Sequence, residues 1–153
     1  MQELRTVIEL QTTPIPRLKP SVGWREIGIV ENKEALVSLN DINQSMIVAN
    51  PQYFNRGVPN ALSKMYLRKS AAVALENAAK SLPVGFKLLI WDAWRPLEVQ
   101  QSLFDEFKSV LHSENPAWDE ERLIKETQTY VSLPSNSPDR PSPHNTGGAV
   151  DLS

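Results

Sequence analysis

Two residues near the end of the chain, His144 and Asp151, have the types and spacing of metal ligands. Imidazole and carboxylate both suit Zn²⁺, and the absence of cysteine excludes a thiolate site. Gly147 and Gly148 lie between them and permit a sharp bend, because glycine adopts positive φ angles without steric cost. A loop histidine and a strand aspartate would then face one ion. The same pattern is also typical of an ordinary glycine-rich turn with His144 on the surface.

A second candidate for chemistry is Arg95. It lies in the segment Trp-Asp-Ala-Trp-Arg-Pro at 91–96, which directly follows the apolar run 88–90. A fixed cation beside a carbonyl oxygen under attack is worth about 10²–10³ in rate, by analogy with an oxyanion-hole donor. Alternatively, Arg95 is a surface charge or the partner of Asp92. We interpret Asp92 as a residue that orients Arg95 or caps the next helix. The other histidine, His112, is interpreted as a cation at a helix C-terminus and not as a ligand.

These two segments resemble the signatures of zinc D-alanyl-D-alanine dipeptidases, the VanX-like family. The segment 142–151 reads Ser-x-His-x-x-Gly-x-Ala-x-Asp, and a looser likeness extends from about residue 41 to the end. The resemblance implies a Zn²⁺ cofactor held by His144 and Asp151, with Arg95 stabilising the transition state. It implies a small D-amino-acid dipeptide as substrate and a substrate contact for Ser142.

Two aromatic residues are further candidates for the wall of a substrate pocket. Trp94 alternates with Trp91 across the strand end, so one ring belongs in the core and the other faces the pocket. Tyr53 and Phe54 lie in a long loop, where they either form the pocket wall or fill the core beneath the loop. In the resembled family this region helps to shape the pocket.

The chain departs from the family in one respect. There, a third ligand and the general base come from a later Glu-x-x-His segment, which is absent from these 153 residues. We therefore expect residues 1–153 to form a single D-Ala-D-Ala dipeptidase-like domain that is incomplete at its C-terminus. Without a third ligand and a base, we expect weak or no zinc binding and no hydrolysis.

Three functions remain open from the sequence. The first is hydrolysis of the D-Ala-D-Ala dipeptide, which requires a closed pocket. The second is a D,D- or L,D-carboxypeptidase acting on peptidoglycan stem peptides, which requires an open groove. The third is a non-catalytic domain that binds a peptide or a protein, which the absent Glu-x-x-His segment favours.

Composition limits the remaining possibilities. The chain is 41% hydrophobic and 22% charged, as expected for a soluble globular domain. Its net charge of −2 gives no electrostatic basis for binding nucleic acid or an anionic membrane. No signal peptide or membrane-spanning segment is visible, which favours the cytoplasm. Nothing in the sequence indicates an oligomeric state.

The pattern of apolar residues predicts an α+β fold, in which helices pack on one face of a small, mainly antiparallel sheet. Residues 1–34, with Pro14, Pro16 and Pro20, are expected to be extended and irregular. The sequence predicts strands at 35–39 and 86–91, and helices at 63–81, from Pro96 to about 111, and at 119–131. The helix 63–81 is expected to bury Leu67, Ala71, Ala74, Leu75 and Ala78 on one face, and the intervals 41–60 and 133–143 are expected to be loops.

Overall fold

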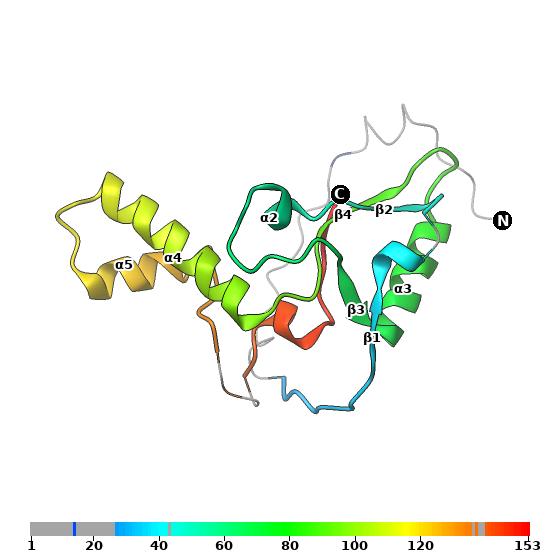
Figure 1. Ribbon diagram of the computed structural model, residues 1–153, viewed down its shortest axis with the longest axis horizontal. Coiled ribbons are helices and arrows are strands. Elements are labelled where there is room, and N and C mark those ends of the chain that lie inside the picture. The colour runs from blue at the N-terminus through cyan, green and yellow to red at the C-terminus, as the bar shows by residue number, and fades with distance from the viewer. Residues whose placement is uncertain (1–13, 15–26, 43, 136, 138–139) are drawn as a thin grey trace.

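The computed structural model describes residues 14, 27–42, 44–135, 137 and 140–153. In chain order the elements are β1 (Leu36–Ser38), η2 (Leu39–Asp41), β2 (Ile47–Ala49), α2 (Gln52–Asn55), β3 (Tyr66–Arg68), α3 (Lys69–Lys80), β4 (Leu88–Asp92), α4 (Leu97–Glu114), α5 (Glu120–Thr127), η3 (Pro143–Thr146) and β5 (Asp151–Leu152). This mixture of helices and short strands confirms the predicted α+β class (Figure 1).

The described strands form two sheets instead of the single sheet expected. A three-stranded sheet has the order β2-β4-β5, and a separate pair joins β1 to β3. The pairs β1–β3 and β4–β5 are antiparallel, whereas β2 and β4 run parallel. β4 is the central strand, as predicted, and its residues Leu88 and Ile90 are buried. It begins two residues later than expected, and Phe86 is exposed in the preceding turn.

The helix predicted from residue 63 begins only at Lys69, because Tyr66–Arg68 pair with β1 as a strand. Leu67 is buried from this strand and not from the helix. The buried residues of α3 are Ala72, Leu75 and Ala79, so the buried face of the helix differs from the predicted one. They join the main core with residues from the strands, including Leu39, Ile47, Leu67 and Ile90.

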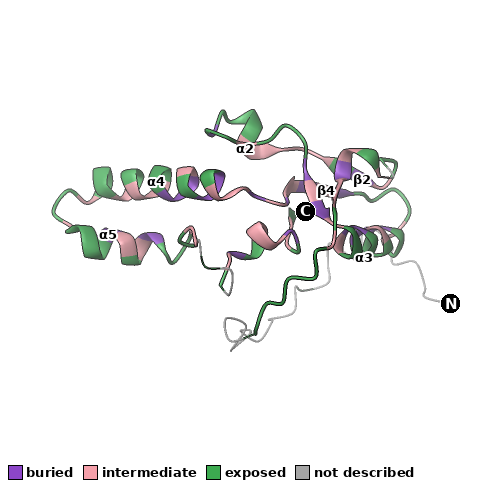
Figure 2. Cartoon of the chain, turned by 60° about the horizontal axis from the view of Figure 1, so that its bottom comes forward, coloured by how far each residue is buried: buried purple, intermediate pink, exposed green. Residues whose placement is uncertain are grey.

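The helices α4 and α5 pack against each other and extend away from the sheets, as Figures 1 and 2 show. The helices with the main contacts to the strands are α2 and α3, whereas α4 and α5 chiefly contact each other. α4 begins at Leu97, one residue after the predicted start at Pro96, which is the N-cap residue. α5 is shorter than the predicted range 119–131, and it begins where the Asp119 side chain accepts a hydrogen bond from the Arg122 amide, 2.9 Å away. A small second core of Val58, Val99 and Leu103 supports the base of α4.

The remaining expectations concern irregular segments. The interval 41–60 contains β2 and α2, so it is not the continuous loop that was predicted. Residues 1–13 and 15–26 of the expected irregular segment lie outside the described residues, and 27–34 form neither helix nor strand. Within the described part of the chain, no helix combines the length and the apolar character needed to cross a membrane.

Candidate metal centre

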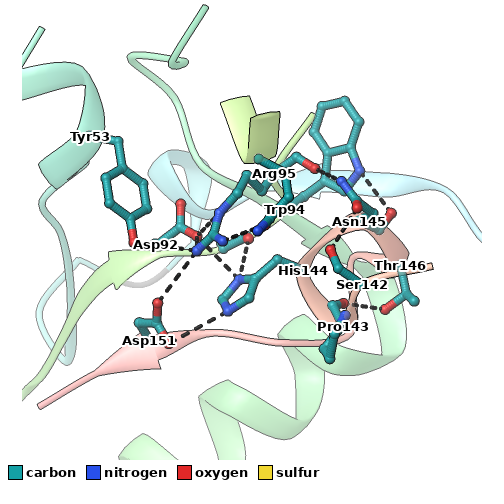
Figure 3. Close-up of polar contacts among 12 residues, drawn as sticks. Tyr53, Asp92, Trp94, Arg95, Ser142, Pro143, His144, Asn145, Thr146 and Asp151 are labelled. Carbon is teal, nitrogen blue, oxygen red and sulfur yellow. Dashed lines mark hydrogen bonds and ion pairs between the residues drawn. The ribbon is translucent and has the colours of Figure 1, made fainter. Parts of the chain in front are cut away.

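Two short elements bring His144 and Asp151 together. His144 lies in the η3 turn, which ends at Gly147 with a φ of 74°. The carbonyl of His144 accepts a hydrogen bond from the Arg95 amide at 3.2 Å, so the turn is attached to the chain just beyond β4. Asp151 opens β5 and pairs with Asp92 of β4. Both predicted ligands therefore lie against the end of the central strand (Figure 3).

The imidazole of His144 has one nitrogen anchored and one available. Its Nδ1 lies 2.8 Å from the carbonyl oxygen of Ala93 and 3.2 Å from Oδ2 of Asp92. Since both neighbours are acceptors, Nδ1 carries a proton and donates it. Nε2 faces Asp151 Oδ1, 3.5 Å away, and its lone pair is available to an ion once Nε2 is deprotonated. Metal-binding histidines are commonly oriented in this way, by donation from the other ring nitrogen to a carbonyl or carboxylate.

The electrostatics of the pair follow from this contact. Burial by itself lowers the pKa of His144, but the hydrogen bonds with Asp151 and the Ala93 carbonyl outweigh it, so the pKa is raised above 6.5. The hydrogen bond from His144 lowers the pKa of Asp151 below its usual value. The two shifts have opposite directions, as expected for an imidazolium beside a carboxylate, and loss of the proton on Nε2 would leave both side chains as potential metal ligands.

Asp92 is the third potential ligand, which the sequence interpretation did not include. Ligand atoms of Asp92, His144 and Asp151 all lie within 4.8 Å of one another. However, Oδ2 of Asp92 accepts hydrogen bonds from Nε and Nη2 of Arg95, at 3.0 and 2.7 Å. Burial raises the pKa of Asp92, and the Arg95 charge offsets part of that shift. The observed contacts match the expected pairing of Asp92 with Arg95.

The guanidinium of Arg95 is buried and held from three sides. Besides Asp92, it donates from Nη1 to Gln100 at 2.6 Å and from Nη2 to the Tyr53 hydroxyl at 3.4 Å. A guanidinium has five N–H donors. Four of them are used in these contacts within the described residues, which leaves one N–H on Nη1 for a ligand. Nη2 also lies 3.7 Å from Asp151, so the cation belongs to the same cluster as the predicted metal ligands.

The other predicted residues take different places. Tyr53 lies beside the site, with its ring centroid 5.0 Å from the Arg95 guanidinium carbon. Ser142 lines a cavity that also contacts Arg95 and His144, and its hydroxyl donates to Asn145 Oδ1 at 2.6 Å, so it also braces the turn. Trp94 does not line that cavity; its indole N–H donates to the Asn145 carbonyl at 3.2 Å, and its ring meets Tyr66 edge-on. His112 is exposed in the last turn of α4, which is the position that the sequence predicted.

Two residues of the site were missed from the sequence. Gln100 is 1% exposed, accepts from Arg95 and donates to the Ser132 carbonyl at 2.6 Å. It lies on the apolar stripe of α4 that continues through Leu103 and Phe107. A polar residue on that stripe was the feature of the sequence that could have identified Gln100 as part of a site. Asn145 donates from Nδ2 to the Arg95 carbonyl, and nothing in its local sequence indicates this contact.

A cavity of about 520 Å³ opens onto the residues of the candidate metal centre. Arg95, His144 and Asp151 line one part of it, whereas Phe107, Val110 and Tyr130 line another. The cavity therefore extends from the candidate metal ligands along the α4–α5 hairpin.

No family model and no curated protein matches this chain. One solved structure that is similar is a mutant of the vancomycin-resistance D,D-pentapeptidase VanY from a VanB-type resistance cassette, in complex with Zn(II). The two structures share a TM-score of 0.45 and 21% sequence identity. The alignment covers 61% of this chain and 48% of that one, so the chain spans about half the length of VanY.

Proposed function

We propose that this chain carries the site of a zinc-dependent peptidase. One observation carries the proposal: Nε2 of His144 and a carboxylate oxygen of Asp151 face each other at 3.5 Å beside a buried guanidinium. One imidazole and one carboxylate are a donor set that zinc accepts. The anchored Nδ1 of His144 is the orientation that such a ligand needs.

In this proposal each residue of the site has a separate role. His144 and Asp151 would hold the zinc ion, which when bound supplies a Lewis acid and a bound water of lowered pKa. Arg95 presents its remaining N–H to a carbonyl oxygen of the substrate, where negative charge develops. Asp92 and Gln100 keep the guanidinium in place, because each accepts a hydrogen bond from it.

For the substrate, we propose a peptide that ends in D-Ala-D-Ala and is longer than the free dipeptide. The D-amino-acid preference comes from the resemblance of the two sequence segments to zinc D,D-peptidases. The length comes from the cavity, which is lined by α4 residues from Gln100 to Val110. This interval spans about 15 Å at 1.5 Å per residue, whereas an extended dipeptide spans about 7 Å. An open site of this length favours the carboxypeptidase alternative over the dipeptidase.

A non-catalytic binding domain is the second candidate. It is favoured by the contacts of Asp92, because Oδ2 already accepts two hydrogen bonds from Arg95 and only Oδ1 is left for an ion. Two protein ligands hold zinc more weakly than three. Such a domain would retain the cavity and the peptide contacts without hydrolysis.

The test combines metal binding with hydrolysis. Zinc binding to the metal-free chain is measured by titration calorimetry for the wild type and for His144→Ala, Asp151→Asn and the control His112→Ala. The first two variants should lose binding, and the control should retain it because His112 is exposed on α4. Hydrolysis is followed with free D-Ala-D-Ala and with a pentapeptide that ends in it, with and without a chelator.

The outcomes separate the alternatives. Chelator-sensitive release of D-Ala from the pentapeptide, with slow or no cleavage of the dipeptide, would support the peptidase and would overturn the expectation of no hydrolysis that follows from the missing third ligand and base. Faster cleavage of the dipeptide would restore the dipeptidase hypothesis. Zinc binding without hydrolysis of either substrate would favour the binding domain, and binding unaffected by His144→Ala would refute the proposed centre.

A further inference from the structure

The cavity continues well beyond the candidate metal ligands, along one stripe of α4. Gln100, Leu103, Phe107 and Val110 line it at helical spacing, and Gln100 contacts Arg95 at one end. Residues three and four apart lie on the same face of a helix. The cavity therefore has a direction: it begins at Arg95 and follows the helix outward.

The outer part of the cavity has an aromatic wall. Phe107 of α4 and Tyr130, which follows α5, pack with ring centroids 5.3 Å apart and an interplanar angle of 52°. Both line the cavity, and Tyr130 is 77% exposed. Exposed rings beside a cavity provide apolar area for a ligand to cover. A peptide chain lying along α4 would pass over this wall.

Opposite charges face each other across the same region. Nη2 of Arg56, at the C-terminal end of α2, lies 2.8 Å from Oε1 of Glu106 on α4, and both residues line the cavity. Their side chains are 54% and 50% exposed. An ion pair that is this exposed contributes little to stability, so it exchanges readily for a ligand group. Glu106 follows Gln100 by six residues, or about 9 Å along the helix, which corresponds to roughly three extended residues.

We propose that Arg56 forms a subsite for a carboxylate side chain of the peptide, two to three residues to the amino side of the reacting bond. This proposal rests on the proposed peptidase function for the position of that bond. The guanidinium of Arg56 uses one N–H on Glu106 among the described contacts, so it retains a fork for a second carboxylate. Glu106 acts as the internal partner that the ligand displaces or joins. The predicted ligand is thus an acidic peptide that ends at the metal centre.

Peptide binding tests the subsite without requiring hydrolysis. Fluorescently labelled pentapeptides ending in D-Ala-D-Ala carry Glu, Gln or Lys at one position, and the substituted position is moved along the chain. Anisotropy titrations in the presence of chelator use the wild type, Arg56→Gln, Glu106→Gln and the control Lys80→Gln. Lys80 is exposed at the end of α3 and does not line the cavity. Circular dichroism confirms that each variant is folded.

The wild type should bind one Glu peptide about three- to tenfold more tightly than its Gln counterpart, which is the range expected for a charge-assisted contact at a half-exposed site. Arg56→Gln should abolish this preference, Lys80→Gln should retain it, and Glu106→Gln should increase it because the competing carboxylate is removed. A preference for Lys, a Glu preference that survives in Arg56→Gln, or no binding at all would overturn the subsite. An Arg56-dependent Glu preference in a protein that neither binds zinc nor cleaves peptides would refute the peptidase and leave the subsite standing.

Discussion

Substitution of Gly147 by alanine tests how tightly the metal-binding turn is packed. Gly147 has a φ of 74°, and a Cβ atom there would lie 2.7 Å from Cδ2 of Leu36 and 3.2 Å from Cγ of Arg68. Its backbone is also tied on both sides, because its amide donates to the His144 carbonyl and its carbonyl accepts from the Arg68 amide. The turn therefore has little freedom to move away from the new methyl group.

Two effects contribute to the expected loss of stability. The left-handed conformation costs an L-residue about 1–2 kcal/mol, and overpacking against Leu36 adds about 1–3 kcal/mol. Gly57→Ala is a matched control, because Gly57 has a φ of 76° and no atom within 4 Å of the added Cβ. It carries the conformational cost alone. We therefore expect Gly147→Ala to lose about 2–5 kcal/mol and Gly57→Ala about 1–2 kcal/mol.

Urea denaturation of the metal-free proteins measures both losses, with the slope m compared to confirm that the unfolding transition is the same. Because the turn carries His144, zinc affinity should also fall in Gly147→Ala and remain in Gly57→Ala. Equal losses of stability in the two variants would show that the methyl group meets no resistance at position 147. The turn would then be looser than the contacts with Leu36 and Arg68 indicate.

Three further predictions concern the groups around the metal. Arg95→Lys should lower kcat by about 10²-fold or more, because an ammonium group cannot reproduce the forked contacts with Asp92 and Gln100, and calorimetry should show little change in zinc affinity. Gln100→Leu should lower kcat at unchanged zinc affinity. Gln100→Glu should retain part of the lost kcat, because its carboxylate still accepts a hydrogen bond from Arg95. If both variants were as active as the wild type, a positioning role for Gln100 would be excluded. Zinc affinity should fall as the pH falls, by tenfold per pH unit below the pKa of His144. This decline should begin above pH 6.5, because contact with Asp151 raises that pKa in the metal-free protein. A calorimetric pH series in which the decline begins below pH 6 would contradict the contact.

The local parts of this site were predictable from the sequence because their residues are close in the chain. His144 and Asp151 are joined by a turn whose glycines are visible in the sequence, and the structure brings the two side chains together. Arg95 follows an apolar run that does form the central strand. Asp92, three residues before Arg95, pairs with it across one turn of backbone. Each of these inferences required only neighbouring residues.

The parts that were missed depend on residues far apart in the chain. Tyr66–Arg68 have apolar spacing compatible with the start of a helix, but pairing with β1 makes them a strand. Gln100 is held by a hydrogen bond to Ser132, thirty-two residues later, and Arg56 by a hydrogen bond to Glu106, fifty residues later. Periodicity identifies the buried face of an element, but it does not identify the element that the face meets. The length of the cavity was therefore not available from the sequence.

The register of β5 on β4 determines whether this site exists. Ile90 pairs with Leu152, but Asp92, and not Trp91, pairs with Asp151, so β4 carries one extra residue at this point. In a regular antiparallel ladder Asp151 would pair with Trp91, and Asp92 would pair with Val150. Because side chains alternate between the faces of a sheet, Asp151 would then point away from the face that carries Asp92. The bulge places both carboxylates on the side of Arg95 and His144, and the Trp91 indole, which donates to Ser153 Oγ at 3.1 Å, holds the end of β5 in that register. A metal centre at this edge thus depends on one irregular residue in the central strand.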